Sequence, residues 1–444
     1  MRTLIKNARI VNEGEIFNGF VLIENEIISK VGTDTSEIPS ADQVIDAENK
    51  FLIPGLIDDQ VHFREPGLTH KGDIQSESTA AVAGGITTFM EMPNTVPQAV
   101  TIEELEKKYD IAAKTSLGNY SFYLGVTNNN INEIRSIDPS RICGIKIFMG
   151  SSTGDMVVDN DNSLDNVFHD SPVLIATHCE DDDTIKENQQ KYIEKFGDDI
   201  PYEHHADIRS HEACYKSSSK AVRLAKENGS QLHIMHLSTK KELELIEQGK
   251  LLDKRITAEA CVHHLWFNRD DYKTKGAFIK WNPAVKDEED RQALIDALNN
   301  DVLDIIATDH APHTLEEKTG VYTKTPSGGP LVQHSLTALM EFHLDGVLDI
   351  TKTVEKACHN PAKLFSIKSR GFIREGYFAD LVLINPDKPW TVEKSNILYK
   401  CGWSPFEGTT FRTQVEKTFV NGHLAYDNGH INDSKQGQRL EFDR

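Results

Sequence analysis

The sequence lacks a long apolar run, paired cysteines and an excess of basic charge. Arg2, Lys6 and Arg9 interrupt the first ten residues, which argues against the apolar core of a signal peptide. No later run is long enough to span a bilayer. The six cysteines form no CxxC pair, so neither a disulfide framework nor a zinc-thiolate site is indicated. We therefore expect a cytoplasmic protein that does not bind membranes.

The scarcity of basic residues restricts the partners of this protein. Lys and Arg number 48 against 69 Asp and Glu, and the net charge of −21 repels nucleic-acid backbones and anionic membranes. We expect a small-molecule substrate instead. If that substrate is a carboxylate, the site must supply local positive charge through metal ions or a specific arginine. The 444 residues suffice for several domains or for one large barrel with an appendage.

Short alternating strands stand at both ends of the chain. The N-terminal segment alternates apolar and polar side chains around Asn and Gly, and the same texture returns in GYFADLVLINPDKPW and VEKTFVNGHLAYDNG. Asn421-Gly422, in the second of these segments, is a typical hairpin turn. We predict that residues 1–52 and 369–444 pair into one small β domain, which leaves residues 53–368 to fold as a unit.

Apolar strands alternate with helical stretches in the middle of the chain, a pattern typical of βα units on a parallel sheet. The eight candidate strands are FLIPGLID, GITTFMEM, NYSFYLGV, GIKIFM, PVLIATH, QLHIMHL, RITAEACV and LDIIATD. Eight such units predict an α/β fold of the TIM (β/α)8 barrel type. The chemistry of that fold sits at the carboxyl ends of the strands, so the polar residues that end these runs are candidates for a site.

Polar side chains mark six of the eight strands. They are Gln60 and His62 after the first strand, Asn94 after the second, Lys146 in the fourth, His178 in the fifth, His236 in the sixth and Asp309 in the eighth. Neutral imidazoles and a carboxylate on one rim suit a hydrolytic Zn²⁺ site with room for water. One such histidine alone is more often a structural residue, but several at corresponding barrel ends favour a metal site.

Lys146 is the unusual member of this set. A strand lysine more commonly extends toward solvent or pairs with an acid, but an unpaired ammonium deep in a barrel is costly. Beside two cations the amine is driven toward its neutral form, and a neutral amine can take up CO₂ to form a carbamate that bridges metals. We therefore expect a CO₂-derived carbamate on Lys146.

Eight motifs follow one another in the order typical of one enzyme family: PGLIDDQVHFREPG, EMPNT, GIKIFMGSSTG, ATHCE, MHLST, TAEACVHHL, NPAVK and ATDHAPH. On these motifs the chain resembles the dihydroorotases of the amidohydrolase superfamily over essentially its whole length. The resemblance implies a TIM barrel flanked by a composite β domain, two zinc ions bridged by a carboxylated lysine, a homodimer and a place in pyrimidine biosynthesis. The residues that match the metal-site residues of that family are His62, Lys146, His178, His236 and Asp309.

Arg64 indicates the substrate. It lies in HFREPG after the first strand, and its guanidinium can bind a planar carboxylate with two hydrogen bonds, as a ring such as dihydroorotate would require. By resemblance, Asn94, Asn282 and His313 join it in binding the ring or the carboxylate, although each alone equally suits a turn or a structural role. The implied reaction is the reversible closure of N-carbamoyl-L-aspartate to L-dihydroorotate with loss of water, and Asp309 is the expected proton carrier.

One position departs from the family pattern. Family members usually have His-x-His after the first strand, whereas this chain has Gln60-Val61-His62, and an amide oxygen is a weak ligand for zinc. We expect one or two zinc ions per chain. Gln60 is then either a loose ligand of the first metal or a residue that only orients water.

Two other functions stay open. An allantoinase or dihydropyrimidinase would share the metal site, but its substrate lacks the ring carboxylate that suits Arg64. A catalytically silent dihydroorotase-like subunit that scaffolds an aspartate transcarbamoylase is the second alternative, and Gln60 is compatible with it. The intact strand-end groups that count against a silent subunit are Lys146, His178, His236 and Asp309.

Overall fold

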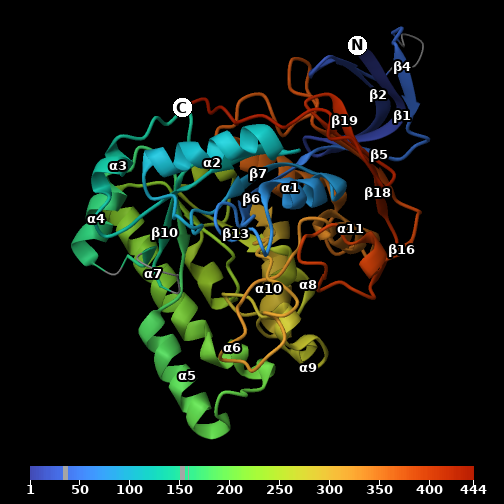
Figure 1. Cartoon of the computed structure of the whole chain (residues 1–444). Helices are drawn as coiled ribbons and strands as arrows, with labels where there is room; N and C mark the ends of the chain where they lie inside the picture. Colours follow the sequence, from blue (N-terminus) through green and yellow to red (C-terminus); the bar gives the residue numbers. More distant parts are fainter. Residues whose placement is uncertain (34–38, 151–155, 159) are drawn as a thin grey trace.

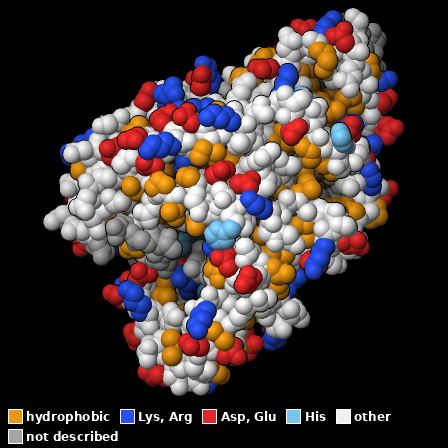
Figure 2. Space-filling view, in the orientation of Figure 1, with side chains coloured by type: hydrophobic (Ala, Val, Ile, Leu, Met, Phe, Trp, Pro, Cys, Tyr) orange, Lys and Arg blue, Asp and Glu red, His pale blue; other side chains and the backbone are white. Residues whose placement is uncertain are grey.

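The computed structural model describes residues 1–33, 39–150, 156–158 and 160–444. It combines a barrel of parallel strands ringed by helices with a large sheet built from the two ends of the chain (Figure 1). Acidic and basic side chains are interspersed over the face drawn in Figure 2. No helix within the described ranges has the length and apolarity that a membrane crossing requires.

Eight parallel strands form the barrel. The third strand consists of two pieces, β8 and β9, on either side of Tyr123. A parallel bridge between Val61 and His310 joins the end of the eighth strand to the first. The predicted TIM barrel is therefore confirmed. Its strands are β6 (Leu56–Val61), β7 (Ile86–Glu91), β8 (Asn119–Phe122), β9 (Leu124–Gly125), β10 (Ile145–Phe148), β11 (Ile175–His178), β12 (Leu232–Ile234), β13 (Ile256–Cys261) and β14 (Ile305–Ala307).

Helices alternate with the barrel strands and cover the outside of the barrel (Figure 1). Helix α2 illustrates why these segments form helices. The Thr101 side chain accepts a hydrogen bond from the backbone N–H of Glu104 and so caps the first turn of α2. Its buried face presents Leu105, Tyr109 and Ala112 at a helical spacing. The helices are α1 (Ile74–Ala83), α2 (Ile102–Thr115), α3 (Ile131–Arg135), α4 (Asp161–Asp170), α5 (Asp182–Phe196), α6 (His205–Ile208), α7 (His211–Asn228), α8 (Val262–Trp266), α9 (Tyr272–Lys275), α10 (Glu288–Asn299), α11 (Ser335–Leu344), α12 (Ile350–Val354) and α13 (Asn360–Leu364).

The two ends of the chain share one nine-stranded sheet, as the composite β domain predicts. Its strand order is β20-β19-β18-β15-β5-β1-β2-β3, with β4 beside β1. The segment FLIPGLID, expected as one strand, divides at Gly55, because β5 joins this sheet and β6 joins the barrel. The strands of the sheet are β1 (Arg2–Asn12), β2 (Glu15–Glu24), β3 (Ile27–Gly32), β4 (Gln43–Asp46), β5 (Phe51–Pro54), β15 (Leu381–Asn385), β18 (Gln414–Val420), β19 (His423–Asp427) and β20 (His430–Ile431). A separate pair consists of β16 (Trp390–Thr391) and β17 (Thr410–Phe411).

The hairpin between β18 and β19 turns at Asn421-Gly422, as the sequence predicts. Both residues have positive φ, 49° and 70°, which is the conformation of a type I′ turn. A side chain at Gly422 would also lie 2.1 Å from the carbonyl oxygen of Asn25. The turn therefore needs glycine for its backbone conformation and for its close packing.

The C-terminal tail closes the floor of the barrel. Arg439 pairs with Tyr120 at the start of the third strand, and Arg444 donates a hydrogen bond from Nη2 to the carbonyl oxygen of Cys143, 2.9 Å away, ahead of the fourth strand. Phe442 belongs to the same buried apolar cluster as Met235 in the barrel interior. Only the opposite rim, at the carboxyl ends of the strands, is left for chemistry.

A buried polar network holds the terminal sheet against the barrel. Asp380, which precedes β15, forms an ion pair with Arg370 and accepts hydrogen bonds from the backbone of Asn421 at 2.7 Å and from Nδ2 of Asn119 at 3.2 Å. Asn421 donates in turn to Oδ1 of Asn119 at 2.8 Å. The ion-pair side chains are each 4% exposed, so each charge depends on the other.

Asp380→Asn should therefore destabilise the protein. The variant leaves the Arg370 guanidinium buried without its counter-charge, which typically costs about 3–5 kcal/mol. We expect a clear fall of the denaturation midpoint, measured by circular dichroism in urea. Asp387→Asn, at an exposed position two residues beyond β15, is the matched control and should leave the midpoint nearly unchanged. Equal midpoints for the two variants would contradict this role of Asp380.

Candidate active site

One cavity at the carboxyl ends of the barrel strands brings the predicted site residues together. Its volume is about 350 Å³, enough for a small ring. The ten predicted residues all line it: Gln60, His62, Arg64, Asn94, Lys146, His178, His236, Asn282, Asp309 and His313. Residues 151–154 of the GIKIFMGSSTG motif lie outside the described residues.

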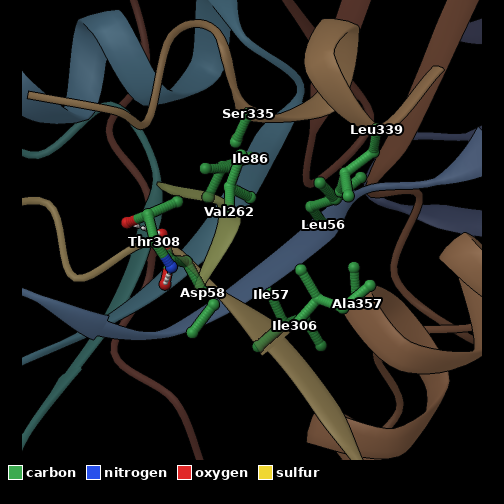
Figure 3. A pocket seen from close by; sticks show the side chains of 11 residues that line it. Leu56, Ile57, Asp58, Ile86, Val262, Ile306, Thr308, Ser335, Leu339 and Ala357 are labelled. Atoms are coloured by element: carbon green, nitrogen blue, oxygen red, sulfur yellow. Dashed lines mark hydrogen bonds between the residues drawn. The ribbon is translucent and has the colours of Figure 1, made fainter. Parts of the chain in front are cut away.

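Asp58 fixes the first strand to the eighth directly below this cavity. Its Oδ2 accepts a hydrogen bond from the Thr308 hydroxyl at 2.6 Å, and its Oδ1 lies 3.2 Å from the backbone nitrogens of Thr308 and Gln60. Apolar side chains such as Leu56 and Ile306 surround the pair (Figure 3). This burial raises the pKa of Asp58 to about 7 despite the hydrogen bonds. The clamp places Gln60 beside Asp309.

His62, Gln60 and Asp309 meet at the mouth of the barrel. His62 Nδ1 lies 2.8 Å from Oδ1 of Asn94, so this nitrogen carries the proton and Nε2 offers a lone pair. That Nε2 is 3.3 Å from Oδ1 of Asp309. Gln60 donates from Nε2 to the same oxygen, also at 3.3 Å, while its Oε1 lies 3.6 Å from Sγ of Cys261. Burial lowers the pKa of His62, which keeps the imidazole available as a neutral ligand.

His178 and His236 face each other across the cavity, with Nδ1 of the first 2.9 Å from Nε2 of the second. His178 Nε2 lies 3.0 Å from Glu180, which also pairs with Arg209. Burial disfavours the charged form of Glu180, but Arg209 and His178 outweigh it and hold the pKa at about 2. The carboxylate thus accepts a hydrogen bond from Nε2–H of His178, which leaves the Nδ1 lone pair directed at the cavity.

Lys146 is buried without a close counter-ion among the described residues. Its side chain is 1% exposed, and its Nζ lies 2.8 Å from the thioether sulfur of Met235, a weak acceptor. Burial lowers its pKa to about 8, although Glu259 and Asp309 oppose the shift. A neutral amine is therefore accessible at moderately alkaline pH.

The donor set of the cavity fits a divalent metal ion. Imidazole nitrogens and a carboxylate oxygen are the ligands that zinc prefers in hydrolytic sites. Nδ1 of His236 is buried with no hydrogen-bond partner among the described residues, and burial holds the pKa of this histidine far below its usual value. Two inward lone pairs at His178 and His236, 2.9 Å apart, need a cation or a proton between them.

A second cluster, deeper in the barrel, does not fit a metal. Asp59, His233 and Glu259 bring their ligand atoms within 4.8 Å of one another and are fully buried. His233 Nε2 lies 3.1 Å from Glu259, and its Nδ1 lies 2.8 Å from the hydroxyl of Thr257, which itself donates to the carbonyl of Leu232. Both ring nitrogens therefore carry protons, and an imidazolium offers no lone pair.

In this deeper cluster the His233 imidazolium balances one carboxylate, because burial and the neighbouring Asp59 raise the pKa of Glu259 to about 8 and favour its neutral form. Burial opposes protonation of His233, but its hydrogen bonds to Asp59 and Glu259 raise its pKa to about 9. Oε1 of Glu259 accepts a hydrogen bond from the backbone of His236 at 3.1 Å, and His236 has a left-handed backbone with φ of 41°. The cluster thus supports the backbone conformation that aims His236 into the cavity.

Arg64 forms part of the cavity wall beside His313. Its Nε donates to the carbonyl oxygen of Pro312 at 3.0 Å, and its Nη2 lies 3.1 Å from Nε2 of His313. The residue is 8% exposed, and burial lowers its pKa to about 10. Asn282 adds a buried Oδ1 with no hydrogen-bond partner among the described residues. This wall offers fixed positive charge in a chain whose net charge is −21.

Several lining residues were not predicted from the sequence. Lys71 places its Nζ 3.2 Å from Nδ1 of His313 and 3.0 Å from Glu317, while Phe148, Trp281 and Ser327 complete the wall. Phe148 lies one strand period after Lys146 in β10 and could have been found in this way, whereas Lys71, Trp281 and Ser327 do not lie on barrel strands. The one available signal for Lys71 was its position in the sequence, because it is a second basic residue shortly after Arg64 in a chain with an excess of acidic residues.

The architecture and the site define a class of protein: a (β/α)8 hydrolase that acts on cyclic amides. Comparison with known proteins identifies the family. The profile of the amidohydrolase family matches residues 51–425. The chain therefore belongs to the amidohydrolase family.

Relatives and solved structures of this family cover nearly the whole chain. The dihydroorotase of Methanosarcina acetivorans is 33% identical over 99% of this chain and 94% of its own length. The dihydroorotase of Pyrococcus abyssi is 30% identical over 98% of both chains. The L-hydantoinase (dihydropyrimidinase) from Arthrobacter aurescens superposes with a TM-score of 0.93 at 27% identity over 99% of both chains.

Gln60→His should strengthen metal binding at the mouth of the barrel. The imidazole would replace an amide that now contacts Asp309 and Cys261 and would offer a better ligand to zinc. We expect a lower Kd for the more weakly held zinc ion, measured by competition with a chelator and by elemental analysis. An unchanged metal affinity and content would show that Gln60 does not reach the metal.

Proposed function

We propose that this protein is a dihydroorotase, which interconverts N-carbamoyl-L-aspartate and L-dihydroorotate with release or uptake of water. The observation that carries this proposal is the buried Arg64 on the cavity wall, next to His313 and in the same cavity as the metal-site residues. A ring carboxylate would compensate its charge and accept two hydrogen bonds from one plane. The relatives named dihydroorotase support the same assignment.

A hydantoinase or dihydropyrimidinase activity is the alternative, favoured by the similarity to solved structures with those names. The ring substrates of such enzymes bear no carboxylate, so they would give the Arg64 guanidinium no charged partner inside the cavity. The buried guanidinium would then depend on the surrounding acidic groups, of which Asp309, Glu91 and Glu317 act on it most strongly. The positive wall therefore favours the acid-bearing ring.

A divalent metal ion, zinc by donor chemistry, would polarise the ring carbonyl and lower the pKa of a water molecule toward neutrality. The residues that would hold it are His62, Lys146, His178, His236 and Asp309. Lys146 would do so as a carbamate, for which its buried and readily neutral amine is suited.

Asp309 would move the proton. Its Oδ1 lies within 3.3 Å of both Gln60 Nε2 and His62 Nε2, at the centre of the cavity mouth. In the hydrolytic direction the carboxylate accepts the proton of the attacking water and passes it to the ring nitrogen that leaves. In ring closure the same group removes a proton from the ureido nitrogen and returns it to the departing oxygen. Gln60 orients the carboxylate for both transfers.

A direct assay tests this assignment. Purified protein loaded with zinc is incubated separately with carbamoyl aspartate, dihydroorotate, allantoin and dihydrouracil. We expect turnover of the first two, followed through the absorbance of the dihydroorotate ring. Turnover of allantoin or dihydrouracil alone would favour the alternative, and no turnover by a metal-replete protein would rule out the proposed enzyme.

Arg64→Met should abolish recognition of the acid-bearing ring. Loss of a buried, hydrogen-bonded charge partner costs about 2–5 kcal/mol, so kcat/KM for dihydroorotate should fall at least about 30-fold. The zinc content should not change. Arg223→Met, which removes an exposed arginine of α7, is the control and should behave as the wild type. Undiminished kcat/KM in Arg64→Met would remove the main support for the substrate.

Asp309→Asn should separate binding from catalysis. A general acid–base residue contributes about 10²–10⁴-fold to rate, and the amide cannot accept the proton. We expect a fall of kcat in that range, while orotate, a non-hydrolysable ring acid, still binds in a calorimetric titration. Zinc content is measured in parallel, because a metal-depleted variant would lose activity for a different reason. A variant that keeps its zinc and its full kcat would exclude Asp309 as proton carrier.

A further inference from the structure

His313 is surrounded by four partners that cannot all be satisfied at once. At Nε2 the ring meets Nη2 of Arg64 at 3.1 Å and the carbonyl oxygen of Ser327 at 3.0 Å. At Nδ1 it meets Nζ of Lys71 at 3.2 Å and Oε2 of Glu317 at 3.3 Å. Each nitrogen thus faces one donor and one acceptor.

The imidazole has one proton to place between these two nitrogens. Burial lowers the pKa of His313 to about 3, so the ring is neutral at working pH. Two arrangements result. In the first, Nδ1–H donates to Glu317 and Nε2 accepts from Arg64. In the second, Nε2–H donates to Ser327 and Nδ1 accepts from Lys71.

These two arrangements differ in what the cavity offers to a carboxylate. In the second arrangement Nη2 of Arg64 has lost its acceptor at Nε2, and a substrate carboxylate can replace the Ser327 carbonyl as the acceptor of Nε2–H, so that both groups donate to the same anion. In the first arrangement a lone pair stands there, which repels an anion and also occupies Nη2 of Arg64. Recognition of an acid-bearing ring therefore requires the second arrangement.

We propose that Lys71 is a specificity-determining positioning residue: by donating to Nδ1 of His313 it places the ring proton on Nε2, where it joins Arg64 in binding the substrate carboxylate. This inference rests on the proposed function and adds to it the means by which the carboxylate is selected. The side chain of Lys71 is 14% exposed and lines the cavity, and its ammonium always carries a proton to donate.

Glu317 keeps Lys71 in this position. Its Oε1 lies 3.0 Å from Nζ of Lys71, and its Oε2 accepts a hydrogen bond from the backbone of Thr314 at 3.1 Å. The backbone of His313 is anchored as well, because Trp403 Nε1 donates to its carbonyl oxygen at 2.7 Å. With ring and ammonium both held, Lys71 decides which imidazole nitrogen carries the proton.

The first experiment measures the tautomer itself. Zinc-loaded protein with isotope-labelled histidine is examined by proton–nitrogen NMR, and His313 is assigned from the signal lost in His313→Gln. We expect protonated Nε2 in the wild type and protonated Nδ1 in Lys71→Met. The same tautomer in wild type and Lys71→Met would overturn the proposal, whatever the substrate proves to be.

The second experiment measures the consequence for binding. Orotate carries the ring carboxylate and uracil is the same ring without it. In Lys71→Met we expect the Kd for orotate and the KM for dihydroorotate to rise about 10- to 100-fold, the range for one hydrogen bond to a charged group. The affinity for uracil and kcat should change little. An equal loss for orotate and uracil would mean that Lys71 does not act through the carboxylate.

Lys324→Met is the matched control, since it removes an exposed lysine outside the cavity from the loop that carries His313. It should bind orotate as the wild type does. If it weakens orotate binding as much as Lys71→Met, general charge attraction explains the effect and the tautomer does not. If wild-type protein binds no orotate but shows the predicted tautomer change, the dihydroorotase assignment fails while the role of Lys71 at His313 stands.

Discussion

The hydrogen bonds between Asp58 and Thr308 are the constraint on which the site depends. Together with the bridge between Val61 and His310 they join the first barrel strand to the last, and this closure brings together the residues that follow on each side, Gln60 and Asp309. The carboxylate sits among apolar side chains (Figure 3), where a broken hydrogen bond could not be replaced by water. Because the two strands are connected rigidly at this point, His62 and Asp309 are held at a fixed separation.

The interior of the barrel carries charged residues in two layers that have different roles. The deeper layer, centred on the His233 imidazolium, is internally compensated and serves to support the backbone of His236. Within the described residues, the upper layer leaves Nδ1 of His236 and Oδ1 of Asn282 without a partner and gives Nζ of Lys146 only the weak thioether acceptor of Met235. Buried polar groups without partners are costly, and a ligand in the cavity would supply the partners that these groups lack.

Strand periodicity was sufficient to predict the barrel and the residues at its rim, because each apolar run fixes where its strand ends. It was not sufficient for Lys71, Glu317 or Ser327, which reach the cavity from loops whose path has no repeating pattern. These three residues, which with Arg64 surround His313, also illustrate a second limit of prediction from sequence. Sequence can name a histidine as a ligand-binding residue, but only the surrounding donors and acceptors decide which of its nitrogens is protonated.

The division of FLIPGLID at Gly55 has a consequence for how the protein is made. Strand β5 pairs with β1, which precedes it, and with β15, which is synthesised only after the whole barrel. Until then one edge of β5 has unpaired backbone groups, in a segment that is apolar and that leads directly into the first barrel strand. On the ribosome this edge is open to pairing with other chains, so the nascent protein is more exposed to aggregation than the finished fold suggests.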